Sequence, residues 1–126
     1  MNDNTRLLRQ VHPGFVQSER ITSQVFRPTP KDENHLSCYN GDKISADEAF
    51  IHFVEYLRFC SQGVMAVTKS ECDSQYLPVK EDGIPFPEHC SIDFSDLLKK
   101  SIEKKAKVLK RYAEKRGWLF QMDDTK

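Results

Sequence analysis

The chain has 126 residues, 38% of them apolar and 30% charged, and its 19 basic side chains balance its 19 acidic ones. A formal charge of zero excludes a global field that would draw the protein to nucleic acid or to a membrane, and no apolar run approaches the ~18 residues of a membrane span. The first ten residues also lack the apolar run of a signal peptide. We therefore expect a cytoplasmic protein with no membrane partner, built as a single domain over 1–126 with polar tails at about 1–5 and 122–126.

The first quarter of the chain is predicted to contain a strand, a rigid corner and a short returning strand. Residues 20–26, RITSQVF, have the β-branched and aromatic bias of a strand. Pro28 and Pro30 end this strand, because proline cannot donate to a β-ladder. LSCY and the Asn-Gly pair after it predict a strand and a tight turn. We interpret the 26–42 segment as a fixed loop.

The first helix is predicted over about residues 46–61. Ser45 and Glu48 form a capping box, and Gly63 is expected to end the helix. At ~100° per residue, one arc of this helix is expected to face the core, and it holds Ala49, Phe50, Phe53, Val54, Tyr56, Leu57 and Cys60. Ile51, His52 and Phe59 fall off that arc. Either the rest of the fold covers these three side chains, or they form a patch that meets a partner.

The second half of the chain is predicted to alternate short strands with a long helix. The strands are GVMAV, SIDF and WLFQ, and a proline-punctuated excursion with a Glu81-Asp82-Gly83 turn separates the first two. Ser95 is expected to cap a helix over about 96–116 that Gly117 ends. Few strands with connections of varied length favour an α+β fold, in which a small mixed or antiparallel sheet is partly covered by two main helices.

Two features of the last helix carry charge. Lys105 falls on its apolar arc, so it either snorkels past the helix rim or meets a carboxylate of the SIDF or KEDG segments. The outer face is rich in lysine and arginine, and it is either a solvated face or a surface that contacts a phosphate backbone. Its nucleic-acid-binding candidates are Lys100, Lys104, Lys107 and Arg111.

No metal site, cofactor site or known catalytic motif is predicted. The cysteines lack a CxxC pair and are expected to be reduced and structural, and they are Cys38, Cys60, Cys72 and Cys90. His89 and Cys90 are adjacent, which is not the spacing of a chelating pair. The chain also lacks GxSxG, a P-loop and GxGxxG, so ordinary hydrolase and nucleotide-binding folds are not indicated.

The loop between the first strand and the first helix has two interpretations. Its own ion pairs and an Asx-type turn at Asp32 would hold it as a structural loop. Alternatively, its polar side chains line a site for an anionic or polar ligand, since arginine supplies a fork for carboxylate or phosphate. The candidates for ligand or partner binding in this region are His12, Arg27, Lys31, Asp32 and Ser37.

Four phrases of the chain carry a resemblance, and they are RQVHPGF, TSQVFRPTPKDENHLS, GVMAVT and EHCSIDFS. They are similar to the pattern of short bacterial proteins of no assigned activity, with an HP pair, an F-x-P-x-x-x-D-x-x-x-LS segment and an H-x-x-I strand. This resemblance implies a bacterial origin and a single domain, and it assigns no catalytic role. The positions it marks for testing are His12, Phe26, Asp32, Ser37 and His89.

Three functions of different classes are expected from these observations. The leading one is a small bacterial interaction or accessory protein that docks on a larger protein through the 26–42 loop or the outer face of the first helix. The second is an enzyme acting on a nucleotide or nucleic acid, in which His12 or His89 is the general base and Arg27 stabilises negative charge. The third is a nonspecific nucleic-acid binder that uses the basic helix over 99–116.

Overall fold

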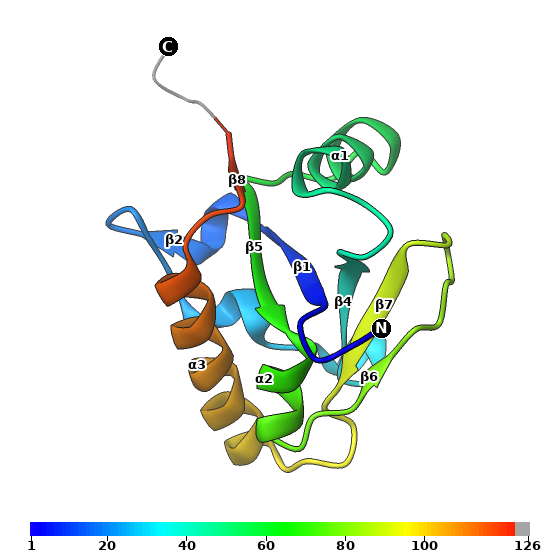
Figure 1. Cartoon of the computed structure of the whole chain (residues 1–126). Coiled ribbons are helices and arrows are strands. Elements are labelled where there is room, and N and C mark those ends of the chain that lie inside the picture. The colour runs from blue at the N-terminus through cyan, green and yellow to red at the C-terminus, as the bar shows by residue number, and fades with distance from the viewer. Residues whose placement is uncertain (123–126) are drawn as a thin grey trace.

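The computed structural model of the protein describes residues 1–122. Its centre is a six-stranded sheet in the order β6-β7-β4-β1-β5-β8, and every neighbouring pair is antiparallel (Figure 1). The strands are β1 (Arg6–Val11), β4 (His35–Asn40), β5 (Gly63–Thr68), β6 (Val79–Lys80), β7 (His89–Asp93) and β8 (Phe120–Gln121). The predicted α+β class is confirmed, and the sheet is antiparallel rather than mixed.

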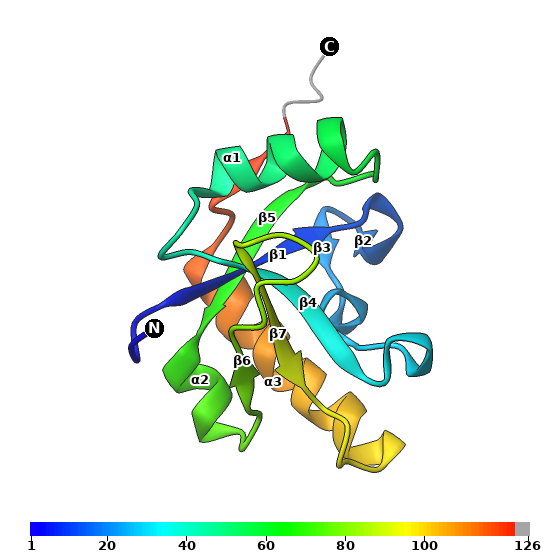
Figure 2. The ribbon, with the colours of Figure 1, turned by 90° about the vertical axis from the view of Figure 1, so that its right-hand side faces the viewer.

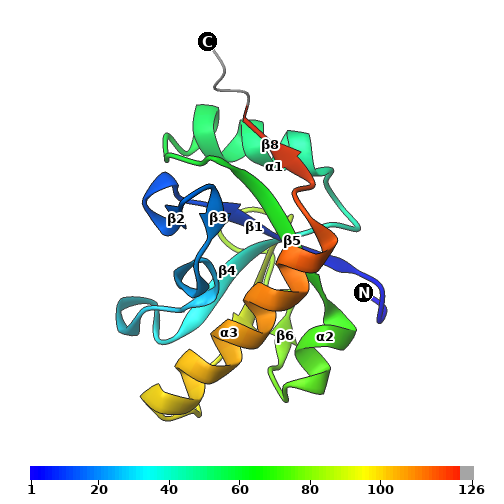
Figure 3. The same ribbon diagram turned by 90° about the vertical axis from the view of Figure 1, so that its left-hand side faces the viewer.

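The helices lie on both faces of this sheet. They are α1 (Ala46–Ile51), which continues into the π-helical turn η4 (His52–Tyr56), α2 (Lys69–Ser74) and α3 (Lys99–Arg116). The 3-10 turns are η1 (Pro13–Phe15), η2 (Ser23–Phe26) and η3 (Pro30–Asp32), and a separate hairpin is formed by β2 (Val16–Gln17) and β3 (Arg20–Ile21). Figure 3 shows α3 in front of the sheet and α1 at the top of the view, behind β8. Within 1–122, no helix combines the length and hydropathy that crossing a membrane requires.

The alternation of side chains along the strands separates two cores. On β1, Leu7 and Val11 belong to a large cluster under α3, whereas Leu8 belongs to a smaller cluster under α1. The paired strand β5 alternates in the same way, with Val67 in the first cluster and Ala66 in the second. Because successive residues of a strand point to opposite faces, each face of the sheet has its own packing partner.

The ends of the two main helices follow the predicted chemistry in part. The capping box of Ser45 and Glu48 is confirmed, with the Glu48 amide 3.3 Å from the Ser45 hydroxyl and the Ser45 amide 3.3 Å from the Glu48 carboxylate. Gly117 ends α3 with φ of 88°, as predicted. Gly63 does not end the first helix, because the chain already leaves it at Arg58, where φ is 63°, and Gly63 begins β5.

The predicted core arc of the first helix is confirmed at Phe53, which packs against the smaller cluster, and is wrong at Tyr56 and Cys60. The π-helical turn places more than 3.6 residues in a turn, so the side chains that follow rotate away from the 100° phase. Tyr56 is 76% exposed and Cys60 is also exposed, although both were expected in the core. His52, which was expected off the arc, is half-buried against Tyr39.

Three other local predictions are corrected. Residues 20–26 form a strand only at Arg20–Ile21, because the chain then turns as η2 and buries Val25 and Phe26 in the cluster under α3. Ser95 does not cap α3, which begins at Lys99; the Ser95 amide instead donates to the Asp93 carboxylate at 2.7 Å. The polar segment after β5 forms α2, which starts with its own capping box.

Two charged or polar groups at the edges of the fold find backbone or side-chain partners. Lys105 snorkels to the rim of α3, where its Nζ donates to the Gln75 carbonyl at 2.5 Å and lies 5.8 Å from the centroid of the Tyr76 ring. It meets neither of the predicted acidic segments. Thr5 is buried and donates to Asp42 at 2.6 Å, so the first residues lie against the body of the protein.

Candidate functional site

The site begins where two central strands of the sheet diverge. β1 and β4 pair only at Leu7–Asn40 and Leu8–Tyr39. Beyond these positions the Arg9 guanidinium bridges η2 and β4. Its Nε donates to the Val25 carbonyl at 2.7 Å, and its Nη1 donates to the Ser37 carbonyl at 2.8 Å. The side chain of Arg9 thus replaces backbone pairing at the point of divergence.

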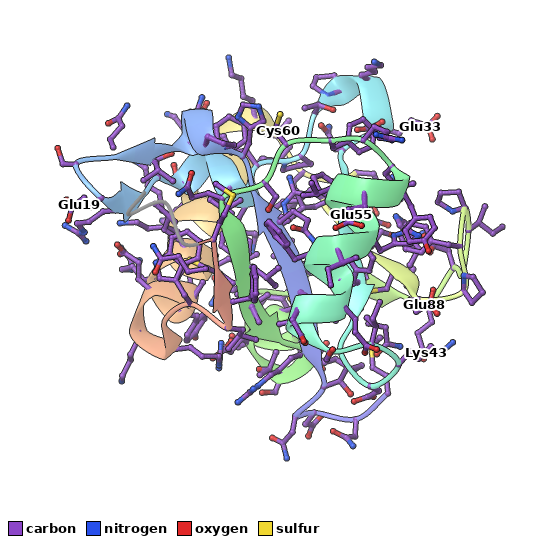
Figure 4. The ribbon with its side chains drawn as sticks, turned by 90° about the horizontal axis from the view of Figure 1, so that it is seen from above. Glu19, Glu33, Lys43, Glu55, Cys60 and Glu88 are labelled. Atoms are coloured by element: carbon purple, nitrogen blue, oxygen red, sulfur yellow. The ribbon has the colours of Figure 1, made fainter. Side chains whose placement is uncertain are left out.

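A cavity of about 290 Å³ opens at this divergence. Its walls are apolar and come from the end of the first helix and from the loop between β6 and β7, and they include Phe53, Leu57, Phe59, Pro85 and Phe86. Figure 2 shows that loop in front of the sheet and below α1. Figure 4 shows the same arrangement from above, with Glu55 on the outward side of the helix and Glu88 on the loop beside it. The polar side chains of the cavity include Arg9, Asp32, Ser37 and His89.

The cavity is the middle of a longer groove. A hollow of about 490 Å³ shares Asp32, Ser37, Pro85 and His89 with it and continues to Lys80. On the opposite side, a hollow of about 350 Å³ shares Arg9, Gln10, Phe53 and Phe59 and continues to His12. The groove therefore runs along the part of the sheet that α1 leaves uncovered.

An aspartate–histidine pair borders the cavity. His89 Nδ1 lies 2.6 Å from Asp82 Oδ1, and the Ser91 hydroxyl donates to the other oxygen of that carboxylate at 3.2 Å. An ionised carboxylate only accepts hydrogen bonds, so Nδ1 of His89 is the donor. The neutral ring then carries its lone pair on Nε2, for which no hydrogen bond is found among residues 1–122.

A second hydrogen-bonded pair fixes the helix above the cavity. The Tyr39 hydroxyl and His52 Nδ1 are 2.7 Å apart, and both rings pack on Phe86, with centroids 5.0 Å and 4.6 Å away. Burial and, to a smaller extent, the charge of Glu88 raise the pKa of Tyr39, so the phenol stays protonated and keeps its hydrogen bond with His52 Nδ1. This pair ties the π-helical turn to β4 and to the loop.

The charge balance of the cavity is set by Arg9. Burial lowers the pKa of Arg9, while Cys38 and Asp32 raise it, and a guanidinium remains charged in proteins. Within the described part of the chain, none of the ion pairs includes Arg9, and both of its hydrogen bonds go to neutral carbonyl groups. A cation in such a position is incompletely compensated.

Three of the predicted site residues come together in the cavity, and these are Asp32, Ser37 and His89. Lys31 lies in the adjoining hollow. His12 lies at the other end of the groove, where its Nδ1 accepts from the Gly14 amide at 2.9 Å and shapes the turn of η1.

Arg27 was predicted as a site residue, but it does not line the groove. It lines none of the three hollows, and its Nε is buried without a hydrogen-bond partner in residues 1–122. The expected ion pairs of the loop are also missing, since none found in this part of the chain involves Arg27, Lys31 or Asp32. Thr29 donates to Asp32 at 3.2 Å instead.

The predicted partner patch divides into two parts. Ile51 is 44% exposed and Phe59 is 56% exposed, whereas His52 is covered by the Tyr39–Phe86 contact. Phe59 also lines the cavity, so the exposed apolar surface of the helix is continuous with the groove.

The sequence did not identify Arg9 and Asp82 as site residues. Arg9 has the position of an ordinary strand residue, and only the divergence of β1 from β4 gives its side chain access to the cavity. The turn predicted at Glu81-Asp82-Gly83 is wrong, because the backbone over 81–84 is irregular and the chain turns at 87–88 instead. The Asp82 carboxylate contacts His89, seven residues further along the chain. A histidine that begins a strand after an acidic segment is the one local signal of such a pair.

Three of the four cysteines are buried and are poorly suited to act as nucleophiles. Cys38, Cys72 and Cys90 are buried, and burial raises the pKa of each thiol, that of Cys38 to about 12. A thiol that remains protonated is a poor nucleophile. In the described residues, no cluster of three or more histidine, cysteine, aspartate or glutamate side chains has an arrangement that could hold a metal ion.

No family model matches this chain, and the comparisons with curated proteins and with solved structures found no match.

Proposed function

We propose that the protein binds a small anionic ligand in the cavity and that the Asp82–His89 pair acts on this ligand, or on a water beside it, as a general base. The observation that carries the proposal is the His89 ring, which borders the cavity while Asp82 holds its Nδ1 at 2.6 Å. This favours the enzyme hypothesis over the accessory-protein hypothesis, with Arg9 in the role first given to Arg27.

The chemistry of the pair supports a base. Asp82 fixes the tautomer that leaves the lone pair on Nε2 and stabilises the imidazolium that forms when Nε2 takes a proton. Ser91 holds the carboxylate in turn. His89 can therefore accept a proton from a hydroxyl group or from water, provided that the ligand brings it within hydrogen-bond distance.

Arg9 supports an anionic ligand. A guanidinium has five N–H donors, and two donors of Arg9 have partners in the protein. The remaining donors match the geometry of a carboxylate or phosphate group. Such a group would provide the charge compensation that Arg9 lacks.

The walls of the cavity support a ligand that also has an apolar part. Phe53, Leu57, Phe59 and Phe86 give a surface on which a ring or alkyl group can pack. A volume of about 290 Å³ is at the small end of ligand pockets. The adjoining hollows extend it enough for a ligand of nucleotide size.

Phenyl phosphate combines the two parts and is the probe we would use. In amide NMR spectra it is expected to shift Arg9, Ser37 and His89, and to bind about tenfold more tightly than inorganic phosphate because the ring is buried. Arg9→Lys should weaken binding about tenfold, since lysine lacks the fork, whereas Arg58→Lys at the end of the groove is the matched control. Shifts confined to the lysines of α3, or equal effects of the two variants, would contradict the proposal.

The role of the base is tested separately with p-nitrophenyl phosphate. His89→Gln should abolish turnover while phenyl phosphate still binds, because a glutamine side chain cannot act as the general base. Turnover that does not depend on His89 would leave a binding site without the proposed base.

One observation favours a second function, that of an accessory protein. Apolar side chains are exposed beside the groove. Tyr56 is 76% exposed and Phe59 is 56% exposed, and through them the protein could dock as an accessory protein on a larger partner. A Tyr56→Ser/Phe59→Ser variant should then fail to recover from native cell extract a protein that the unchanged chain recovers. Recovery of the same protein by both would refute docking at this surface.

A further inference from the structure

A straight line of cations runs along the solvent side of α3, on the opposite side of the sheet from the groove. Its members are exposed, and we call them the basic stripe, which consists of Lys100, Lys104, Lys107 and Arg111. Their spacing of four, three and four residues keeps them within about 60° of one another around the helix axis and spreads them over about 16 Å along it.

The basic stripe is not neutralised by the protein. In residues 1–122, the ion pairs on this helix are those of Glu114 with Arg20 and Lys110 and that of Arg116 with Glu71, and none of them involves a member of the stripe. The segment 99–116 has a formal charge of +7 and the rest of the chain has −7, so the zero net charge conceals a strong separation.

The hairpin beside the helix adds a hollow to this surface. A hollow of about 540 Å³ lies between the hairpin and α3, and a paired contact holds its walls together, because Arg20 donates twice to Glu114 at 3.0 and 3.1 Å. The polar side chains of the hollow include Gln17, Ser18, Thr22, Ser23, Lys107 and Arg111. Hydroxyl and amide groups beside cations are the groups that contact phosphate and sugar oxygens.

We propose that the basic stripe and this hollow bind the phosphate backbone of a nucleic-acid duplex, without reading its sequence. A row of point charges about 16 Å long matches the repeated phosphates of a regular helix. This inference is independent of the function proposed for the cavity.

The surroundings of the stripe favour a duplex over two other polyanions. No aromatic side chain belongs to the stripe, and binding of single strands relies on stacking of bases on aromatic rings. A membrane-surface helix inserts its apolar face among lipids, but the apolar face of α3 is packed in the core through Ile102, Ala106, Leu109 and Ala113. The charged face of α3 is therefore the face that is available to a ligand.

The test is fluorescence anisotropy with a fluorescein-labelled 20-base-pair duplex of mixed sequence, in DNA and RNA forms. Four phosphate contacts predict a slope of log affinity against log salt of about −3.6, or a loss of roughly 100-fold between 50 and 200 mM salt. Lys104→Gln/Lys107→Gln/Arg111→Gln should reduce the slope by about three. Lys31→Gln/Lys43→Gln/Arg58→Gln removes the same charge elsewhere and should leave the slope unchanged.

Three outcomes would overturn the proposal. These are no binding of either duplex at 50 mM salt, equal losses in the two triple variants, and tighter binding of the corresponding single strand or of vesicles containing phosphatidylserine. The melting temperatures of both variants are measured as a control for folding. They should match that of the unchanged protein, because the substituted side chains are exposed and glutamine is a comparable helix former.

Discussion

The two faces of the sheet differ in what covers them. Under α3, the face is closed by large apolar side chains that are fully buried, among them Phe26, Phe94 and Leu109. On the other face, α1 covers only the small cluster around Tyr39 and Ala66, and strand residues beyond that cluster, such as Ser37, His89 and Ser91, are polar. The difference teaches that one face holds the fold together, which leaves the other free to carry the aspartate–histidine pair and the groove.

The largest expected effect tests the closed face. Leu109→Ala should lower the free energy of unfolding by about 2–5 kcal/mol, because Leu109 is 0% exposed and its loss leaves a cavity. Lys104→Ala, on the exposed side of the same helix, should change it by less than about 0.5 kcal/mol. Urea unfolding measures both. A cost below about 1 kcal/mol for Leu109→Ala would mean that α3 is not the main cover of the sheet.

The next effect concerns the electrostatics of the open face. Burial alone would raise the pKa of Asp93, but hydrogen bonds from Ser95 and the positive charges of Lys80 and His35 outweigh burial and lower this pKa from 3.8 to about 2. A lowered pKa means that the folded state prefers the ionised carboxylate. The resulting stability is fully present above about pH 4 and is lost as the pH falls toward 2.

Asp93→Asn measures this contribution. The variant should lose up to about 2 kcal/mol of unfolding free energy at pH 7, since the Asp93 side chain is only 12% exposed. The difference from the unchanged protein should shrink between pH 4 and pH 2. Asp96→Asn, an exposed neighbour, changes the charge equally and serves as the control. A difference that stays constant down to pH 2 would show that Asp93 acts by packing rather than by charge.

The features that could be predicted from the sequence are those that depend on residues adjacent in the chain. The capping box at Ser45 and the end of α3 at Gly117 depend on a few adjacent residues, and both are confirmed. The same rule could have identified α2, whose Thr68 and Glu71 also form a capping box. However, α2 has only six residues, and the polar composition of the segment favoured a loop.

The failures depended on contacts between distant segments. The π-helical turn after Ile51 fits the helix to the Tyr39–Phe86 cluster, and it changed the side-chain phase that a regular wheel assumes. Residues 23–26 turn instead of extending, because Phe26 fills the core under α3. The candidate site was predicted in part, through Asp32, Ser37 and His89, but Arg9 enters it only through the divergence of two strands.

The smallest expected effect on stability separates structure from binding on the open face. Ser37 and Ser91 are directly opposite each other on β4 and β7. Ser91 is 3% exposed and donates to Asp82, whereas Ser37 is exposed and its hydroxyl makes no hydrogen bond with any described residue. Ser91→Ala should therefore cost about 1 kcal/mol of unfolding free energy, and Ser37→Ala less than about 0.5 kcal/mol.

Binding of phenyl phosphate should follow a different order from stability. Ser37 lines the cavity, so its loss should weaken binding roughly threefold to tenfold through one missing hydrogen bond. Calorimetric titration and urea unfolding of the two variants give both quantities. If Ser37→Ala lowers stability as much as Ser91→Ala and leaves binding unchanged, then the polar residues of this face are structural, and the contrast between the two faces is one of composition alone.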